Sequence, residues 1–87
     1  MTEKIKNYHI YVTLGCPYCN GAVKLLEEKK EKFIVTVLDN DREKLAQLKE
    51  HFSWQTVPMI VGTTEEGKEV FLGGFTDLEK RFELLKG

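Results

Sequence analysis

Residues 8–22 read YHIYVTLGCPYCNGA and contain both cysteines of the chain, Cys16 and Cys19. The segment Tyr8–Val12 is β-branched and aromatic, which favours a β-strand. Pro17 stands where a proline favours the first turn of a helix. Apolar residues then recur on one face of that helix, at Cys19, Ala22, Val23 and Leu26. The sequence therefore predicts a strand, a short turn and a helix, with the two thiols at the start of the helix.

The middle of the chain predicts a second strand and a second helix. Residues 33–38 (FIVTVL) are almost wholly apolar, as expected of a strand that is buried on both faces. Residues 39–41 (DND) supply side chains for a turn and for a helix N-cap. An amphipathic helix that ends near His51 is predicted by apolar residues at helical spacing, namely Leu45, Leu48 and Phe52.

The last part of the chain predicts a hairpin and a third helix. The hairpin has strands at Val57–Val61 and Glu69–Leu72, joined by the polar, glycine-bearing loop GTTEEGK. The helix runs from about Asp77 to Lys86, and residues 76–79 (TDLE) have the Ser/Thr-x-x-Glu form of a capping box. Its inward-facing residues are expected to be Leu78, Phe82 and Leu85.

These elements follow the order β-α-β-α-β-β-α within a single expected domain, residues 1–87. The first two strands, joined by a helix, should be parallel with a right-handed crossover. The last two strands should form an antiparallel hairpin. A four-stranded mixed sheet flanked by helices accommodates all of these elements, so the predicted fold class is α/β.

The composition restricts the partners and the compartment. Thirteen basic and fourteen acidic residues give a formal net charge of −1, which offers no broad attraction to nucleic acid or to an anionic membrane. The N-terminal residues lack the apolar core and the cleavage site of a signal peptide. No apolar stretch approaches the roughly 20 residues that span a bilayer. We therefore expect a cytoplasmic protein, in which a permanent disulfide is disfavoured.

The cysteine pair could be a structural disulfide, half of a metal site, two inert core thiols or a reactive couple. A bridge from Cys16 to Cys19 closes too short a loop to constrain the unfolded chain. Zinc prefers four ligands, and the chain adds only His9 and His51, without motif spacing, so no metal is expected. At a helix N-terminus, free backbone N–H groups and the helix dipole stabilise a thiolate. We therefore favour a reactive couple in which Cys16 attacks and Cys19 resolves, with Pro17 stiffening the bridge.

Two later stretches add to this interpretation. Residues 55–58 (QTVP) place Pro58 at the start of a strand, where it marks an edge or a special turn. A cis peptide there would turn the Val57 backbone outward, so that an extended peptide could add as a strand. Residues 73–77 (GGFTD) combine glycines that permit close approach with a helix N-terminus that can hold a carboxylate. Thr76 and Asp77 can also simply cap the last helix.

The three motifs Cys-Pro-Tyr-Cys, Thr-Val-Pro and Gly-Gly-x-x-Asp, in this order and spacing, resemble the glutaredoxin family over essentially the whole chain. The resemblance implies a thioredoxin-like fold and a glutathione-dependent thiol–disulfide oxidoreductase. It implies that Cys16 carries the glutathionyl mixed disulfide and that Cys19 is the resolving thiol. The implied glutathione-binding residues are Tyr18 beside the site, Thr56 and Val57 at the cysteinyl backbone, Pro58 in the cis form, and Phe75, Thr76 and Asp77 at the γ-glutamyl end.

The chain departs from the family pattern at positions that often carry a positive charge. Thr13 stands three residues before the first cysteine, where many members have a basic residue, and Asn20, Gly21 and Val23 follow the second. Thiolate stabilisation would then depend more on the helix terminus than on side-chain cations. Contact with the glycyl carboxylate of glutathione is left open, with Lys24 or a residue near Trp54 as candidates.

The leading hypothesis is a monomeric dithiol glutaredoxin that reduces protein disulfides and glutathione mixed disulfides, with ribonucleotide reductase as a client by family analogy. One alternative is a redoxin that is reduced by thioredoxin reductase instead of glutathione. The other is a non-catalytic module that binds a peptide at the Val57 strand edge.

Overall fold

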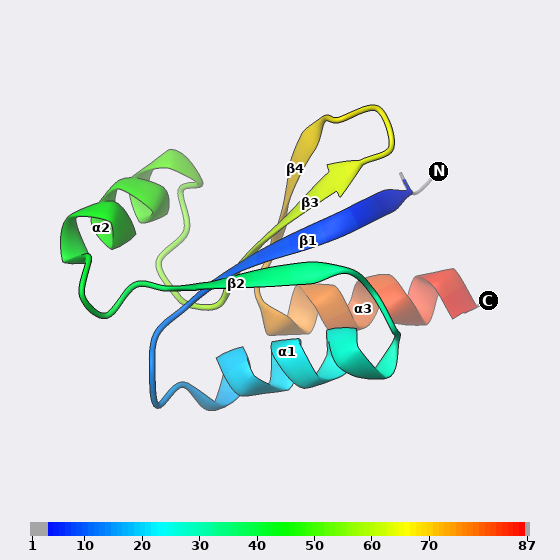
Figure 1. The fold of residues 1–87 in the computed structure, drawn as a ribbon, viewed down its shortest axis with the longest axis horizontal. Coiled ribbons are helices and arrows are strands. Elements are labelled where there is room, and N and C mark those ends of the chain that lie inside the picture. Colours follow the sequence, from blue (N-terminus) through cyan, green and yellow to red (C-terminus); the bar gives the residue numbers. More distant parts are fainter. Residues whose placement is uncertain (1–3, 87) are drawn as a thin grey trace.

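The structure, a computed structural model, describes residues 4–86, and of residues 85 and 86 only the backbone. Seven elements follow one another in the predicted order β-α-β-α-β-β-α (Figure 1). They are β1 (Ile5–Val12), α1 (Pro17–Glu28), β2 (Phe33–Val37), α2 (Arg42–His51), β3 (Met59–Thr64), β4 (Glu69–Gly73) and α3 (Phe75–Lys86). No helix within the described range is long and apolar enough to cross a membrane.

The four strands form one mixed sheet in the order β2-β1-β3-β4. Strands β1 and β2 are parallel, with Tyr8 opposite Phe33 and Val12 opposite Val37. Strand β3 is antiparallel to β1 and to β4. This arrangement confirms the predicted thioredoxin-like α/β fold, including the parallel first pair and the antiparallel hairpin.

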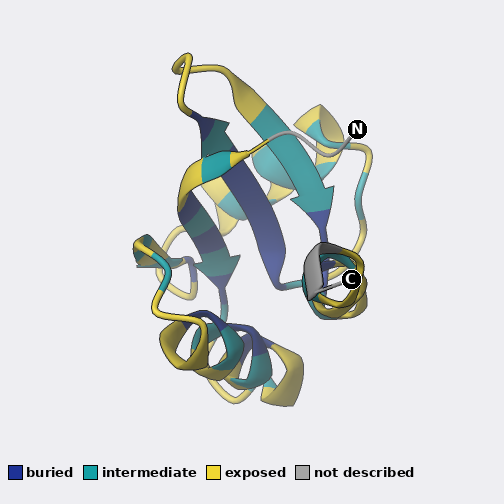
Figure 2. Cartoon of the chain, turned by 90° about the vertical axis from the view of Figure 1, so that its right-hand side faces the viewer, coloured by how far each residue is buried: buried dark blue, intermediate teal, exposed yellow. Residues whose placement is uncertain are grey.

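The core lies between one face of the sheet and the helices α1 and α3, which run together along that face (Figure 1). Figure 2 shows the buried residues in the middle of the sheet and on the helix faces that turn toward it. Each fully buried large aliphatic side chain contributes roughly 1.5–3 kcal/mol relative to an exposed one. The buried members of this cluster are Tyr8, Ile10, Val12, Cys19, Ala22, Leu26, Ile60 and Leu78. Because Cys19 belongs to it, the core itself fixes one end of the thiol pair.

The prediction that residues 33–38 form a strand buried on both faces is wrong. Strand β2 is the outermost strand of the sheet, and Ile34 is 62% and Val37 49% exposed. Only Leu38, which follows the strand and donates its backbone N–H to the Val12 carbonyl (2.9 Å), is fully buried. An edge strand has a neighbour on one side only, so apolar character alone does not bury it.

The hairpin begins and turns later than the sequence predicts. Strand β3 starts at Met59 and continues to Thr64, because the peptide bond between Val57 and Pro58 is cis and keeps these two residues out of the ladder. Only residues 65–68 remain as the connecting loop, which Gly67 closes with a φ of 84°. The hairpin prediction was therefore right in the number of strands; the boundaries of β3 were wrong by two and three residues, and β4 starts at the predicted residue and ends one residue later.

Helix α3 starts two residues before the predicted position, so the predicted capping box at residues 76–79 is wrong. The helix begins at Phe75, and the Gly74 N–H donates to Asp77 Oδ2 at 2.9 Å. The Gly74 carbonyl in turn accepts from the Leu78 N–H at 3.1 Å. Leu78 is fully buried and Phe82 partly buried, as predicted. The side chain of Leu85 lies outside the described residues.

Candidate active site

Cys16 is the N-cap of helix α1. Its backbone is extended (φ −101°, ψ 109°), and Pro17 occupies the first helical position. The Cys16 Sγ accepts a hydrogen bond from the Cys19 N–H at 3.2 Å. The sulfur therefore takes the place of the hydroxyl or carboxylate oxygen that usually satisfies a free N–H at a helix start. A negative charge on this sulfur would be stabilised by that N–H and by the helix dipole.

Cys19 lies one turn into the helix and is buried, whereas Cys16 is half-buried. Burial, followed by hydrogen bonding to Cys16, raises the pKa of the Cys19 thiol to about 12. A thiol with such a pKa remains protonated at neutral pH and is a poor initial nucleophile. The two sulfurs are free rather than bridged, and Cys16 is the more exposed of the two.

The cis peptide between Val57 and Pro58 lies directly beside the thiol pair. The Cys16 Sγ–H donates to the Val57 carbonyl at 3.8 Å. Pro58 is fully buried and Val57 half-buried, so this turn is fixed against the core with its Val57 backbone next to the sulfur. The cis form of Pro58 is the one that the resemblance to glutaredoxins implies.

A groove of about 230 Å³ extends from this turn toward helix α3. The Tyr18 and Phe75 rings both line it and contact each other at a tilt, with centroids 6.0 Å apart. The groove brings together every residue that the resemblance assigns to glutathione binding, and adds Trp54 and Gly74. Its full lining is Tyr18, Trp54, Thr56, Val57, Pro58, Gly74, Phe75, Thr76 and Asp77.

Two glycines explain how this groove is closed at its α3 end. A Cβ at Gly73, whose φ is 101°, would overlap the Asp77 carboxylate, so only glycine lets that side chain reach back to the Gly74 N–H. A Cβ at Gly21 of α1 would lie 3.2 Å from the Phe75 ring. Gly21, unfavourable in a helix by about 1 kcal/mol relative to alanine, thus leaves room for the aromatic wall of the groove.

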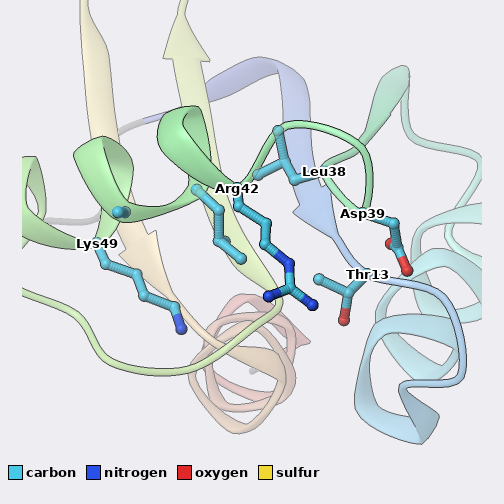
Figure 3. A pocket seen from close by; sticks show the side chains of 7 residues that line it. Thr13, Leu38, Asp39, Arg42 and Lys49 are labelled. Carbon is cyan, nitrogen blue, oxygen red and sulfur yellow. The ribbon is translucent and has the colours of Figure 1, made fainter.

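A second cavity, of about 390 Å³, lies between the end of β1 and helix α2. Figure 3 shows the Arg42 guanidinium extending toward Thr13, with the Lys49 side chain farther along the helix. Its lining is Thr13, Leu38, Asp39, Arg42, Leu45, Ala46 and Lys49. Two cationic side chains of α2, Arg42 and Lys49, therefore line the same cavity as the uncharged Thr13. Lys24, a candidate for this role in the sequence, lines neither cavity.

The comparisons with known proteins identify the family. Residues 9–65 match the family model for glutaredoxin. The chain belongs to the glutaredoxin family. The solved glutaredoxin of Brucella melitensis is 30% identical, with a TM-score of 0.72 over 91% of this chain and 80% of that one. Glutaredoxin 1 of Francisella tularensis, solved in complex with cacodylate, is 26% identical, with a TM-score of 0.69 over 93% and 98%. No curated protein matches the chain.

Membership in the glutaredoxin family makes this chain a thiol–disulfide oxidoreductase, with Cys16 and Cys19 as its redox centre. Glutaredoxins use glutathione as a cosubstrate. Within the described residues, no three His, Cys, Asp or Glu side chains gather closely enough to hold a metal ion.

Sequence reasoning did not single out helix α2, whose Arg42 and Lys49 line the cavity that also contains Thr13. Arg42 and Lys49 lie in a helix with alternating charges, which reads as an ordinary solvent-exposed face. The sequence offers one indirect signal for these two cations. Thr13 lacks a positive charge at the end of β1, and α2 begins with Arg42 shortly after β2, which is parallel to β1 and ends beside it. Trp54 lines the groove and packs edge-on against Phe71, with ring centroids 5.3 Å apart.

Proposed function

We propose that this glutaredoxin is a glutathione-dependent oxidoreductase that reduces protein disulfides and glutathione mixed disulfides. One observation carries the proposal. A half-buried sulfur that caps a helix lies 3.8 Å from the Val57 carbonyl, at the end of a groove formed by all seven residues expected to bind glutathione. A thiol alone would serve any redoxin, whereas the groove supplies a site of suitable size and polarity for a small thiol peptide.

The groove offers a partner for each part of the glutathionyl group near the sulfur. The open Val57 backbone pairs with the extended cysteinyl backbone, as an added strand does. Farther along, the first N–H groups of α3 suit the γ-glutamyl carboxylate. The Asp77 carboxylate suits the γ-glutamyl ammonium, and Thr76 supplies a hydroxyl beside it. Tyr18 and Phe75 cover the apolar part of glutathione that lies between its cysteinyl backbone and its γ-glutamyl charged groups.

The glycyl carboxylate at the other end of glutathione requires a cation, and we assign it to Arg42 and Lys49. Both line the cavity that also contains Thr13, three residues before Cys16. Arginine binds carboxylates with a bidentate geometry, and lysine adds a mobile point charge. The two helix side chains thereby replace the basic residue that many family members carry at the position of Thr13.

The chemistry follows from the different environments of the two sulfurs. The Cys16 thiolate attacks the glutathionyl sulfur of a mixed disulfide, and the client leaves as a thiolate that takes up a proton. The thiolate of a second glutathione then attacks the glutathionyl sulfur that is bound to Cys16. This attack releases glutathione disulfide and restores the Cys16 thiolate. With a protein disulfide, Cys16 first forms a mixed disulfide with the client. Cys19 then gives up its proton, attacks the Cys16 sulfur and displaces the client as a thiolate, and two glutathiones reduce the resulting Cys16–Cys19 disulfide.

The deciding experiment couples the reduced protein to glutathione, glutathione reductase and cysteine–glutathione disulfide, and follows NADPH oxidation. Turnover that saturates with the mixed disulfide is expected, and Arg42→Gln with Lys49→Gln should raise its KM about tenfold by removing both cations. Lys24→Gln is the matched control, since Lys24 is exposed and lines neither cavity. Turnover with thioredoxin reductase but none with glutathione would overturn the proposal.

The proposal also names a client protein and a compartment. By family analogy, ribonucleotide reductase is the proposed protein substrate, and a monomer in the reducing cytoplasm the proposed working form. Support of ribonucleotide reductase turnover by catalytic amounts of the reduced protein would test this assignment. Failure there, with turnover of the mixed disulfide intact, would remove the client and leave the glutathione chemistry standing.

A further inference from the structure

Asp39 connects the end of β2 to the loop that carries the reactive thiol. Its Oδ1 accepts a hydrogen bond from the Leu14 N–H at 2.8 Å, across 25 residues of sequence. Figure 3 shows the Asp39 carboxylate beside Thr13 at the rim of the α2 cavity. Leu14 lies two residues before Cys16, so a carboxylate from the turn after β2 holds the backbone just ahead of the attacking sulfur.

Few other contacts hold this loop in place, apart from a hydrogen bond of the Thr13 backbone to the buried Cys19 thiol. Strand β1 ends at Val12 and α1 begins at Pro17, the Leu14 side chain is 73% exposed, and Gly15 has a φ of 72°. An exposed side chain gains nothing by burial, and glycine restrains the backbone least of all residues. A hydrogen bond to an ionised acceptor is about twice as strong as a neutral one. The Asp39 contact is therefore a principal restraint on residues 13–15.

We propose that Asp39 is a positioning residue of the thiol centre, which holds the loop so that Cys16 stays in its N-cap geometry beside Val57. Two contacts of the sulfur depend on that geometry, namely the hydrogen bond from the Cys19 N–H at 3.2 Å and the approach to the Val57 carbonyl at 3.8 Å. A looser loop would populate conformations in which the sulfur lacks its N–H donor and its thiolate is less stabilised. This inference needs only that Cys16 is the attacking thiol.

The charge of Asp39 has a second, separable consequence. Asp39 is among the groups whose negative charge raises the pKa of the Cys19 thiol, after burial and the Cys16 hydrogen bond. Closure of the intramolecular disulfide requires Cys19 to lose its proton, attack Cys16 Sγ and displace the bound glutathione as its thiolate, which is then protonated. Removing the charge should speed this step, whereas removing the hydrogen-bond acceptor should slow the first attack by Cys16.

Asp39→Asn and Asp39→Ala separate the two effects, because asparagine keeps a side-chain oxygen acceptor without the charge. Asp41 provides matched controls two residues away. It is an equally exposed acid whose Oδ1 accepts a backbone N–H, that of Lys44 at 3.0 Å, but the bond caps α2 instead of holding the thiol loop. Asp41→Asn and Asp41→Ala therefore remove the same charge and the same kind of bond without touching residues 13–16.

The first measurement is the rate of Cys16 alkylation by iodoacetamide at pH 7 in a Cys19→Ser background, read by mass spectrometry. Asp39→Ala should slow alkylation about fivefold, the loss of roughly one charged hydrogen bond. Asp39→Asn should restore the rate to within about twofold, and the Asp41 variants should match the parent. A normal rate in Asp39→Ala, or a folded Asp39→Asn that remains as slow as Asp39→Ala, would overturn the proposal.

The second measurement follows closure of the Cys16–Cys19 disulfide after Cys16 has been loaded with glutathione. Asp39→Asn should close about twofold faster than Asp41→Asn, a small factor because water screens an exposed charge. Equal closure rates in Asp39→Asn and Asp41→Asn would show that the Asp39 charge does not act on Cys19. The restraint of the loop by Asp39 would then be tested by the alkylation rates alone. Alkylation needs no glutathione, so an Asp39 effect on it would stand even if the protein failed to turn over glutathione mixed disulfides.

Discussion

Helices α1 and α3 both begin at the thiol centre, and their N-termini are capped by different chemistry. At α1 the cap is the Cys16 sulfur, and the first turn contains no acidic residue. At α3 the Asp77 carboxylate reaches back to the Gly74 N–H at 2.9 Å. The same helix dipole, with partial positive charge at each N-terminus, is met at α3 by a carboxylate and at α1 by a cysteine sulfur.

This difference separates reaction from recognition. Because no carboxylate competes for the first N–H groups of α1, their full effect falls on the sulfur that attacks. The N-terminus of α3 is already partly neutralised, so Asp77 can present a fixed negative charge to the groove. One capping residue at each helix start therefore decides whether that start serves reaction or recognition. Mutation of these capping residues tests this division.

The largest effect is expected from removing the α1 cap. Cys16→Ser should lower turnover of a glutathionylated substrate at least about a thousandfold, because a hydroxyl at this position is not ionised at neutral pH and does not replace the sulfur nucleophile. Serine is also a good N-cap, so the helix should remain intact by circular dichroism. Steady-state turnover with cysteine–glutathione disulfide measures the loss.

Cys19→Ser provides the matched control within the same helical turn. It should keep turnover of the mixed disulfide within about threefold, since that route needs one sulfur, and it should abolish multiple-turnover reduction of a protein disulfide. Equal losses in both assays for the two variants would contradict the division of roles between the thiols.

The next effect concerns stability at alkaline pH. The Cys19 thiol has a folded-state pKa of about 12 against an ordinary value of 9.0. Between these values the unfolded chain releases the proton while the folded chain keeps it, so stability falls as pH rises above about 9, by at most about 1.4 kcal/mol per pH unit. Urea unfolding of the reduced protein at pH 8 and pH 10 should show this loss, and Cys19→Ser should lack most of it. The same slope in both proteins would place the titration elsewhere.

Asp77 tests the α3 side of the comparison. Asp77→Ala should destabilise the fold by about 1 kcal/mol, because the Gly74 N–H loses its acceptor. Asp77→Asn keeps an oxygen acceptor and should retain most of that stability. Both variants should raise the KM for the mixed disulfide several-fold, since both remove the charge proposed to meet the γ-glutamyl ammonium. Unchanged KM values with reduced stability would leave Asp77 as a cap only.

The sequence predicts these two helix starts unequally well, for local reasons. At α1, Pro17 and the cysteine spacing admit a single start, and the structure has it there. At α3, residues 76–79 form a capping box in sequence, but Gly74 and Asp77 also stand at N-cap and N3 spacing. The second pair is used, because Gly73 adopts a φ of 101° that directs the chain into the helix earlier. Two local signals competed, and backbone geometry outside both decided between them.

Features that depend on long-range pairing could not be predicted in the same way. The run FIVTV has the composition of a buried strand, and its position at the sheet edge follows only from the insertion of β3 between β1 and β4. Arg42 and Lys49 reach the thiol side of the molecule because α2 follows that edge strand. By contrast, the seven groove residues that the family resemblance implies could be anticipated, because each belongs to a short motif whose local conformation, a cis proline or a helix start, is carried by its own residues. Trp54 belongs to no such motif and was not assigned to the groove.

The smallest effect should come from the residue that joins the two helix starts. Gly21 of α1 faces the Phe75 ring of α3, and a Cβ there would lie 3.2 Å from Cε1 and 3.3 Å from Cζ. In Gly21→Ala, a gain in helix propensity of about 1 kcal/mol should be offset by the shift that this contact imposes, so the change in unfolding free energy should be near zero. Asn20→Ala, exposed on the same helix, gains propensity without such a contact and should be more stable than the parent.

The displaced ring should still be detected in binding. Phe75 lines the groove and contacts the Tyr18 ring, so a shift of a few tenths of an ångström should raise the KM for the mixed disulfide about twofold in Gly21→Ala and leave kcat unchanged. Asn20→Ala should change neither parameter. If Gly21→Ala instead raised the free energy of unfolding by the full gain in helix propensity and left the KM unaltered, the Phe75 ring would have made room for the methyl group without any cost. The α1 and α3 helix starts would then act on the substrate independently, and their contact would serve packing alone.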